Sequence, residues 1–390
     1  MKIAHISKKL SILLMVAGAK GAVGSTVGAA VAAINKDPDA ILSCLTTCRR
    51  FSSFLSSPEM QMVGWDTNVK SLGAAMEENG VLPDSLRKEH MEGIEKIIIR
   101  KPPSSMSDPK NQIKKLKEDM AEFGKAYPES YPVFINLLPA VGRIGRKNLN
   151  DLFQANSKTA KFFPDLLYAI AAVESGIPVI NFTPNKIEAP AFLLATQREH
   201  VPIAGRDGKT GQTYLKVVLA SALKERQFHV SGWYSLNLLG NADGKNLMDP
   251  EKASGKLANK TAVLDEILGT SGQKKSVRPF HKVHIDYYPP RGDAKEAWDV
   301  IDFSGLFGLP MSIRINLLGR DSILAAPLVL DLARWMVVLK AAGFSGPVPQ
   351  LGFYFKMPVG KNPPLTFQEQ AAALDRLEKD CMKRLMLKGK

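Results

Sequence analysis

The sequence has few cysteines and no long apolar run. Its 390 residues include three cysteines, too few for a disulfide-stapled fold. Cys44 and Cys48 lie near one another in the chain, but no histidine pair at metal-ligand spacing accompanies them, so no metal site is predicted. The absence of about 20 consecutive apolar residues argues against a membrane-spanning helix. The low cysteine count suits a reducing compartment, and we expect a cytoplasmic protein.

Acidic residues are scarce relative to basic ones. The chain has 38 Asp and Glu against 52 Lys and Arg, a net charge of +14. Such a charge suggests an anionic partner, either a nucleic acid or a phosphorylated small molecule. The basic clusters are scattered, lack interleaved aromatic residues and form no recognised nucleic-acid motif. We therefore expect a small-molecule partner and neither nucleic acid nor a membrane.

No internal repeat appears, and the length predicts two domains. Strands and helices alternate over residues 1–205, which indicates a parallel sheet with crossover helices, interrupted by a helical excursion at about 71–129. Residues 206–321 contain runs of period-two alternation, which predict an open sheet of about four strands in a second domain. Residues 322–390 begin with a predicted long apolar helix like those of the first domain. We therefore expect this part of the chain to return to the first domain.

A glycine-rich turn near the start has two interpretations. Residues 11–34 read SILLMVAGAKGAVGSTVGAAVAAI, with Gly18, Gly21 and Gly24 spaced by three after an apolar run. A secretory signal also combines basic residues, an apolar stretch and small residues, but Lys20 falls where cleavage would occur. A buried strand, a turn that lets the backbone approach a pyrophosphate and a helix N-terminus explain the order of the glycines better.

The nucleotide preference is left open by the next segment. Residues 41–47, ILSCLTT, are predicted to form the second strand. A nicotinamide-binding fold often has an acidic residue about 20 positions after the glycines, to hold the ribose hydroxyls. Arg49 and Arg50 stand there instead, which favours a 2′-phosphate and leaves NADP as an alternative to NAD. The next acidic candidate is Asp66, in MVGWDTN after a short apolar strand.

Polar residues gather in several further motifs. Lys256 and Lys260 are four apart and would share a helix face, where a phosphate could separate their like charges, although a solvated helix face has the same pattern. Lys356 lies between Phe355 and Met357 in a predicted apolar strand, and burial would suit it for proton transfer, although its side chain could also reach solvent. The other motifs are GRDGKTGQT, NLLGNADGKNL, PPRGDAK and GRDS.

These motifs, in this order and over nearly the full length, resemble the myo-inositol-1-phosphate (inositol-3-phosphate) synthases. The resemblance is carried by GAKGAVGST, GWDTN, LYAIAAVESGIPVINFTPN, GRDGKTGQT, NLLGNADGKNL, KLANKTAVLDE, GDAK, GRDSILAAPLVLDL and FYFKMP. It implies an α/β fold with an NAD(P)-binding Rossmann domain built from both chain ends and an inserted α+β catalytic and oligomerisation domain. It also implies a homotetramer.

The resemblance implies an isomerase that converts D-glucose 6-phosphate to 1D-myo-inositol 3-phosphate, the first step of inositol and inositol phospholipid biosynthesis. C5 is oxidised by bound NAD⁺, C6 is enolised and attacks C1 in an intramolecular aldol step, and the new ketone is reduced by the same cofactor. A monovalent or divalent cation is a possible further component.

The resemblance also implies roles for individual residues. Four lysines match active-site positions: Lys256, a proton shuttle at the C5 hydroxyl; Lys295 and Lys356, which stabilise oxyanions; and Lys260, which holds the phosphate. The implied cofactor-binding residues are Gly18, Ala19, Lys20, Gly21, Ala22, Val23, Asp66, Asp207, Thr210, Asn241, Ala242, Asp243, Asp293 and Asp321. The implied substrate-binding residues are Asn237, Asn241, Lys209 and Ser322.

The sequence departs from the family at the cofactor loop. The eukaryotic loop G-x-G-G-N-N-G is here GAKGAVG, so one glycine and both asparagines are missing, and Ala242 replaces another asparagine. These changes bear on cofactor affinity and on NAD against NADP. Two alternatives are retained: a paralogue that cyclises another sugar phosphate, such as fructose 6-phosphate to a five-membered ring, and a basic nucleic-acid-binding protein on a Rossmann scaffold.

Overall fold

The computed structural model describes residues 11–51, 59–105, 107–141, 164–241, 244–245, 247–248, 263–270 and 278–388. Its strands are β1 (Ser11–Ala17), β2 (Met60–Trp65), β3 (Ile98–Arg100), β4 (Ser130–Asn136), β5 (Val179–Asn181), β6 (Pro202–Gly205), β7 (His229–Leu239), β8 (Phe280–Tyr287), β9 (Ala294–Ser304), β10 (Pro310–Arg320) and β11 (Gly346–Pro347). Its α-helices are α1 (Ala22–Lys36), α2 (Pro38–Leu42), α3 (Thr46–Arg50), α4 (Leu72–Asn79), α5 (Asp84–Glu89), α6 (Met91–Glu95), α7 (Pro109–Ala126), α10 (Pro164–Glu174), α11 (Pro190–Arg198), α12 (Gly211–Glu225), α15 (Asp321–Ala341) and α16 (Phe367–Lys388). Three short 3₁₀ helices are η3 (Pro289–Arg291), η4 (Leu306–Gly308) and η5 (Pro349–Tyr354).

The larger sheet has seven strands in the order β11-β6-β5-β4-β1-β2-β3. Every strand pairing in it is parallel. The chain starts in the middle of the sheet and proceeds first to one edge and then to the other, so the order reverses between β1 and β4. In open α/β sheets of this kind, ligands bind outside the carboxyl ends of the strands at that reversal. This arrangement confirms the predicted α/β class.

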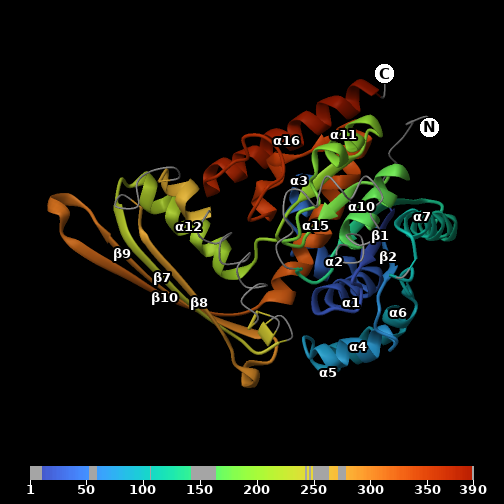
Figure 1. Cartoon of the computed structure of the whole chain (residues 1–390), viewed down its shortest axis with the longest axis horizontal. Helices are drawn as coiled ribbons and strands as arrows, with labels where there is room; N and C mark the ends of the chain where they lie inside the picture. Colours follow the sequence, from blue (N-terminus) through green and yellow to red (C-terminus); the bar gives the residue numbers. More distant parts are fainter. Residues whose placement is uncertain are drawn as a thin grey trace.

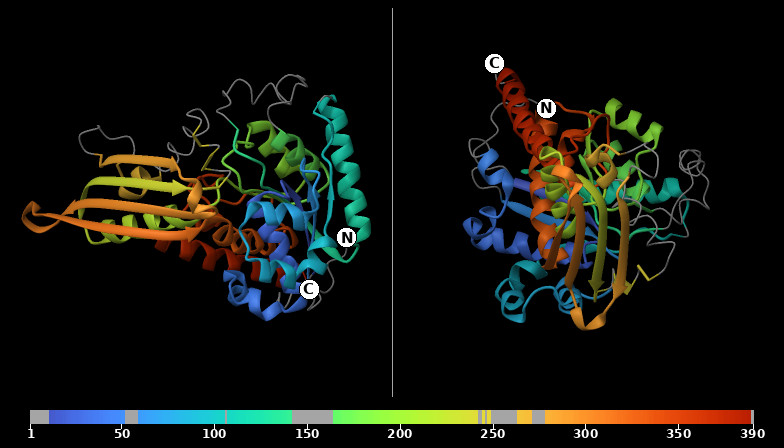
Figure 2. Two further views of the ribbon diagram at one scale, coloured as in Figure 1. Left: turned by 90° about the horizontal axis from the view of Figure 1, so that it is seen from below. Right: turned by 90° about the vertical axis from the view of Figure 1, so that its left-hand side faces the viewer.

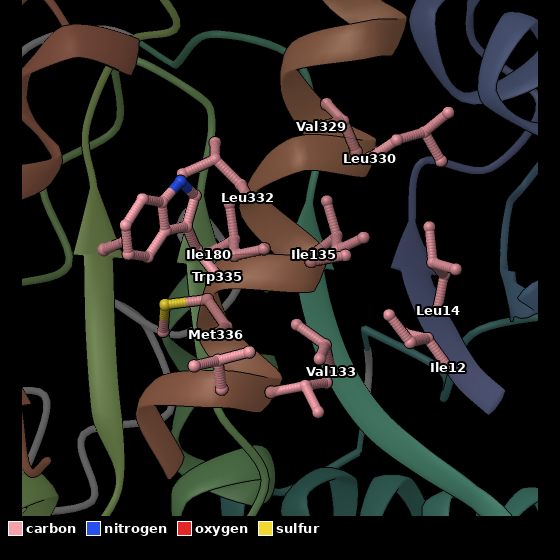
Figure 3. Packing of buried hydrophobic residues seen from close by; sticks show 14 of the residues in the cluster. Ile12, Leu14, Val133, Ile135, Ile180, Val329, Leu330, Leu332, Trp335 and Met336 are labelled. Atoms are coloured by element: carbon pink, nitrogen blue, oxygen red, sulfur yellow. The ribbon is translucent and has the colours of Figure 1, made fainter. Parts of the chain in front are cut away.

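Helices cover both faces of this sheet. On one face, α1 and the long α15 pack on alternate residues of β1 and β4, and Figure 3 shows Ile135 between Leu14 on one side and Ile180 and Trp335 on the other in this core. On the other face, α7, α10 and α11 pack on the intervening residues. Both faces of the central strands are therefore buried, which explains why β1 reads as a continuous apolar run rather than an alternating one.

Helix α15 is both long and apolar. It is the one helix of the described residues that is long and apolar enough to cross a membrane, and 78% of its most apolar window is buried inside the protein. Its position across the sheet accounts for that composition. Together with β11, which pairs with β6, it brings the C-terminal part of the chain into the sheet that the N-terminal part begins.

The smaller sheet has four strands in the order β10-β9-β7-β8 and extends away from the larger one (Figure 1). Helix α12 packs on one face through a cluster that includes Val217, Ala220 and Trp233 (Figure 2). The other face carries exposed apolar side chains, among them Tyr234, Phe280, Trp298 and Leu318. The predicted open sheet of about four strands is confirmed, although β9 was not recognised as one of them.

The prediction of a strand at residues 41–47 is wrong. That segment contains the end of α2, a turn and the start of α3. The carboxylate of Asp331, on α15, accepts hydrogen bonds from the backbone N–H groups and the hydroxyls of Thr46 and Thr47. These bonds satisfy N–H groups that a helix start leaves without partners. The second strand of the sheet is β2, and Asp66 follows it directly.

Lys356 is also not on a strand. It follows η5, and only one isolated bridge, between Gly208 and Phe355, joins its neighbourhood to another segment in a sheet-like way. The apolar residues around Lys356 resemble a strand in the sequence because Tyr354 and Phe355 are both buried in the core.

Candidate active site

A cavity lies where the loop after β6, the start of α12, the ends of β7 and β8, β9, α15 and the segment after η5 converge. Its described lining residues are Asp207, Thr210, Thr213, Asn237, Leu239, Leu247, Ile285, Lys295, Asp321 and Lys356. Six of these were predicted as site residues from the sequence: Asp207, Thr210, Asn237, Lys295, Asp321 and Lys356. The structure thus brings together motifs that are up to 149 positions apart, as for Asp207 and Lys356.

Two lysine–aspartate ion pairs face this cavity. Lys356 Nζ donates to Asp207 Oδ1 at 2.7 Å, and Lys295 Nζ donates to Asp321 Oδ2 at 2.9 Å. Both ammonium groups are largely buried, with 15% and 16% of their side chains exposed. Each carboxylate lies within hydrogen-bond distance of its ammonium group, and the attraction between opposite charges offsets part of the cost of burying them. The cavity therefore presents two fixed cations, which suits a ligand that carries or develops negative charge on oxygen.

The remaining wall is mostly apolar. Leu239 and Ile285, at the ends of β7 and β8, line it together with Leu247, and Asn237 presents a buried amide from the same strand as Leu239. Thr213 completes it from the first turn of α12. Four lining residues were not predicted from the sequence: Thr213, Leu239, Leu247 and Ile285. The sequence held a signal for two of them. Thr213 stands within the GRDGKTGQT motif. Leu239 is two residues after Asn237, so the side chains of Asn237 and Leu239 point to the same face of β7.

Asp293, Ser322 and Asn241 form a group beside Asp321. Ser322 Oγ donates to Asp293 Oδ1 at 3.2 Å, and Asn241 Nδ2 contacts the same oxygen at 3.4 Å. Burial raises the pKa of Asp293, and the hydrogen bonds from Asn241 and Ser322 oppose that rise. Neither Asp293, Ser322 nor Asn241 belongs to the cavity lining, so in this structure they support the wall behind it.

Lys209 does not point into the cavity. Its ammonium nitrogen bonds to the carbonyl oxygen of Gly352 at 2.9 Å and to Gln370 Oε1 at 2.5 Å, and its side chain is buried. Burial lowers the pKa of Lys209 to about 7. Lys209 was predicted to bind the substrate because of the motif in which it stands. The motif alone does not indicate the direction in which its side chain points.

The glycine-rich turn lies between β1 and α1, at the carboxyl end of the larger sheet. Gly18 has φ +82°, and a Cβ there would lie 2.8 Å from the carbonyl oxygen of Leu137. A Cβ on Gly24 would lie 2.5 Å from the carbonyl oxygen of Gly18. By contrast, a Cβ on Gly21 would meet no atom closer than 3.5 Å, so packing within the chain does not explain that glycine.

Asp66 closes this turn from the end of β2. Its Oδ2 accepts the backbone N–H of Lys20 at 2.7 Å, and its Oδ1 accepts that of Asn68 at 2.8 Å. The Lys20 ammonium in turn donates to the carbonyl oxygens of Asn68 and Lys70. Asp66 thus occupies the place, after the second strand, where a dinucleotide-binding fold has its ribose-binding acid. The remaining predicted residues of the turn are Ala19, Ala22 and Val23, which lie between Gly18 and Gly24 in the chain.

Four predicted site residues fall outside the part of the chain that the structure describes: Ala242, Asp243, Lys256 and Lys260. Their assignments stay predictions. Arg50, one of the two arginines that left NADP open, is ion-paired with Asp375 and Glu378 of α16. Within the described residues, no group of three or more His, Cys, Asp or Glu side chains could hold a metal ion.

Comparisons with known proteins agree with the motifs. The sequence model of the myo-inositol-1-phosphate synthase family matches residues 211–322. Inositol-3-phosphate synthase 1 of Bacteroides thetaiotaomicron is 42% identical over 206 residues, which cover 52% of this chain and 48% of that protein. The chain thus spans about half the length of this relative.

Two solved structures share the fold. The inositol-3-phosphate synthase of Caenorhabditis elegans superposes with a TM-score of 0.81 at 19% identity, covering 96% of this chain and 86% of that one. A myo-inositol-1-phosphate synthase-related protein of Thermotoga maritima gives a TM-score of 0.76 at 20% identity, covering 95% and 98%. At these identities the superpositions establish the architecture, in agreement with the parallel sheet described above.

Proposed function

Because the chain is related in sequence to the inositol-3-phosphate synthases, we propose that it cyclises D-glucose 6-phosphate to 1D-myo-inositol 3-phosphate. The observation that carries this proposal is that two partly buried ion pairs, Lys295–Asp321 and Lys356–Asp207, lie on one cavity. The substrate is rich in hydroxyl groups, and its rearrangement places negative charge on the oxygens attached to C5 and C1. Fixed ammonium groups in a largely water-excluded wall stabilise such charge strongly.

The residues of the cavity would have different roles in the enolisation and aldol steps. Deprotonation at C6 next to a C5 ketone gives an enolate, whose oxygen is stabilised by an ammonium group, and the enolate carbon then forms a bond to C1. The aldehyde oxygen at C1 gains negative charge in that step, and the second ammonium group stabilises it. Leu239, Leu247 and Ile285 exclude water, which would otherwise protonate the enolate. The predicted roles of Lys256 and Lys260 complete this scheme.

The glycine turn fits the pyrophosphate of a dinucleotide. Gly21 keeps open a space that a side chain would fill, next to the N-terminus of α1, whose N–H groups and dipole favour an anion. Asp66, which directly follows β2, would hold the adenosine ribose hydroxyls. When bound, NAD would supply a hydride acceptor that is regenerated within the cycle, so the reaction needs no net oxidant.

The position of Asp66 favours NAD over NADP. A carboxylate beside the ribose repels a 2′-phosphate, and Arg50 is engaged by α16 instead. In a fluorescence titration of the purified protein, we expect NADH to bind at least about tenfold more tightly than NADPH, which corresponds to about 1.4 kcal/mol. Equal or tighter binding of NADPH would contradict this assignment of Asp66.

The direct test of the function is product identification. Purified protein is incubated with glucose 6-phosphate and NAD⁺, the product is dephosphorylated, and the cyclitol is identified by NMR. We expect myo-inositol. If folded, cofactor-loaded protein gives no cyclitol from glucose 6-phosphate, the substrate assignment is wrong, and fructose 6-phosphate becomes the next substrate to test.

We also propose that the outer face of the smaller sheet joins copies of the chain in a homotetramer. Phe280, Tyr234, Trp298 and Leu318 are exposed on it, and the residues paired with them across the strands point to the same side. These partners include Lys282, Glu296 and Asn316, and large exposed apolar side chains with polar residues around them are typical of a protein–protein contact surface. Two copies related by a two-fold axis would each bury the same patch.

A single charge tests this interface. Because Trp298 lies in a central strand of the sheet, the Trp298→Glu variant places a carboxylate in the middle of the patch on every copy. We expect it to lower the mass measured by light scattering from that of a tetramer to that of a monomer or dimer at micromolar concentration. The Lys96→Met variant, on an exposed helix end of the larger domain, is the control and should keep the wild-type mass. An unchanged mass for Trp298→Glu would exclude this face.

A further inference from the structure

Lys209 occupies a fully enclosed polar site behind the active-site wall. Its amine nitrogen contacts Gly352 O, at the turn of η5, and Gln370 Oε1, in the first turns of α16. The orientation of the Gln370 amide is fixed, because its nitrogen donates to the carbonyl oxygens of Leu365 and Pro364. Its oxygen is therefore the atom presented to Lys209.

The surroundings match a neutral amine. A neutral lysine has two N–H groups, and the described residues offer its nitrogen two acceptors, Gly352 O and Gln370 Oε1. A third proton would add a charge that no described carboxylate neutralises by hydrogen bonding. The lowered pKa of Lys209 agrees with this count of donors and acceptors.

The backbone around Lys209 carries the Lys356–Asp207 pair. Lys209 N donates to Tyr354 O at 2.8 Å, and Lys356 N donates to Asp207 O at 2.8 Å. Arg206 and Met357 exchange two further backbone bonds. The loop that presents Asp207 and the segment that presents Lys356 are thus joined side by side by backbone hydrogen bonds. The Lys209 side chain attaches them to η5 and to the start of α16.

The start of α16 is itself held in place by several hydrogen bonds. Glu369 Oε2 accepts the backbone N–H groups of Leu365 and Thr366, and Thr366 Oγ1 accepts that of Glu369, which forms a capping box. The N–H of Phe367 donates to Ser221 Oγ of α12, the helix that covers the smaller sheet. The start of α16 is therefore attached to both parts of the fold that enclose the cavity.

We propose that Lys209 is a positioning residue, which holds the Asp207 loop and the Lys356 segment against the start of α16 and so sets the place of the Lys356 ammonium in the cavity. This inference rests on the proposed function, since it concerns the placement of a lysine that would stabilise an oxyanion. It differs from the sequence-based expectation, in which Lys209 contacts the substrate directly.

The test is the Lys209→Met variant, which keeps the length of the side chain and removes both N–H groups. Since a displacement of about 1 Å at a reacting group can cost about a hundredfold in rate, we expect kcat for glucose 6-phosphate to fall by about tenfold to a hundredfold, with KM changed by less than about threefold. A substrate contact would raise KM instead. The Gln370→Leu variant, which removes the acceptor and keeps the lysine, should change kcat in the same direction.

A matched control is available in Lys216. This lysine of α12 is also buried and also has a lowered pKa, but it contacts His281 and the ring of Trp233 rather than the Asp207 loop. The Lys216→Met variant should keep kcat within about threefold of wild type, since its displacement of neighbours does not reach Lys356. A comparable loss of kcat in both variants would show a general effect of removing a buried lysine and would overturn the proposal.

Two further readouts do not depend on activity. A crystal structure of Lys209→Met, superposed on β7 and β9, should show Lys356 Nζ displaced by about 1 Å from its place in the wild-type cavity. The urea midpoint of the wild type should rise from pH 7 to pH 10, because the unfolded chain binds a proton at Lys209 that the folded chain has released, and this rise should be smaller in Lys209→Met. An unshifted Lys356 in the variant would refute the positioning role. Failure of wild-type protein to form a cyclitol would instead refute the proposed function and leave the geometric result standing.

Discussion

Replacing Lys295 by methionine is expected to lower the rate of inositol phosphate formation by about a hundredfold to a thousandfold, the usual effect of removing one oxyanion-stabilising donor. The physical reason is the fixed position of its ammonium group, which Asp321 holds at 2.9 Å on the cavity wall. Because the group acts mainly on charge that develops during the reaction, kcat should fall more than KM rises. The measurement is steady-state production of inositol phosphate at several glucose 6-phosphate concentrations.

Lys356→Met should give a loss of similar size, for the same reason. The matched control is Lys96→Met, since that lysine is exposed on the end of α6 and pairs only with Glu92 at 2.7 Å. Circular dichroism and thermal melting would establish that each variant is folded. If both cavity variants were folded and retained more than about a third of wild-type kcat, the two ion pairs would not be the catalytic groups.

A valine at Gly21 is expected to weaken NAD binding by roughly a hundredfold, equivalent to about 2.7 kcal/mol, while leaving the fold intact. Gly21 has φ −68° and ψ 169°, a conformation that valine adopts readily. Its side chain would enter space that the chain itself leaves open. A pyrophosphate displaced by that side chain would lose charge-assisted hydrogen bonds to backbone N–H groups, each worth about 1.5–3 kcal/mol. Calorimetric titration with NAD⁺ measures the effect.

The contrast with Gly18 makes this prediction specific. At Gly18 even alanine meets the carbonyl oxygen of Leu137 at 2.8 Å, in a backbone conformation that disfavours any side chain. Gly18→Ala should therefore lower the melting temperature, whereas Gly21→Val should leave it within about 2 °C of wild type, because surface changes without a clash rarely exceed about 0.5 kcal/mol. Undiminished NAD binding by a folded Gly21→Val protein would place the pyrophosphate elsewhere.

The features that local sequence determines were predictable. The run before Gly18 could be assigned to a central strand because it is apolar at every position, and the spacing of the glycines indicated the turn. The motifs around Asp207, Lys295, Asp321 and Lys356 also identified residues that the structure gathers on one cavity. In each case, the informative pattern lies within about ten consecutive residues.

The errors arose where a distant residue decides the local structure. The segment at 41–47 has the composition of a strand, but its helix starts are stabilised by Asp331, 285 positions away from Thr46. That misassignment also produced the apparent absence of a ribose-binding acid, since the second strand comes later and Asp66 follows it. Likewise, the direction of Lys209 depends on Gln370, 161 positions later, and no local pattern encodes it.

The crossing of α15 over the larger sheet has a consequence for folding during synthesis. The side chains of Ile12, Leu14, Val133 and Ile135 that α15 covers belong to strands that leave the ribosome before α15, which follows β4 by about 190 residues, a wait of roughly ten to forty seconds at typical rates of synthesis. During that interval one face of the nascent sheet has no cover from this helix. The chain should consequently depend on protection from aggregation while it is being made, and a stop before α15 should yield insoluble protein even though every strand from β1 to β6 is present.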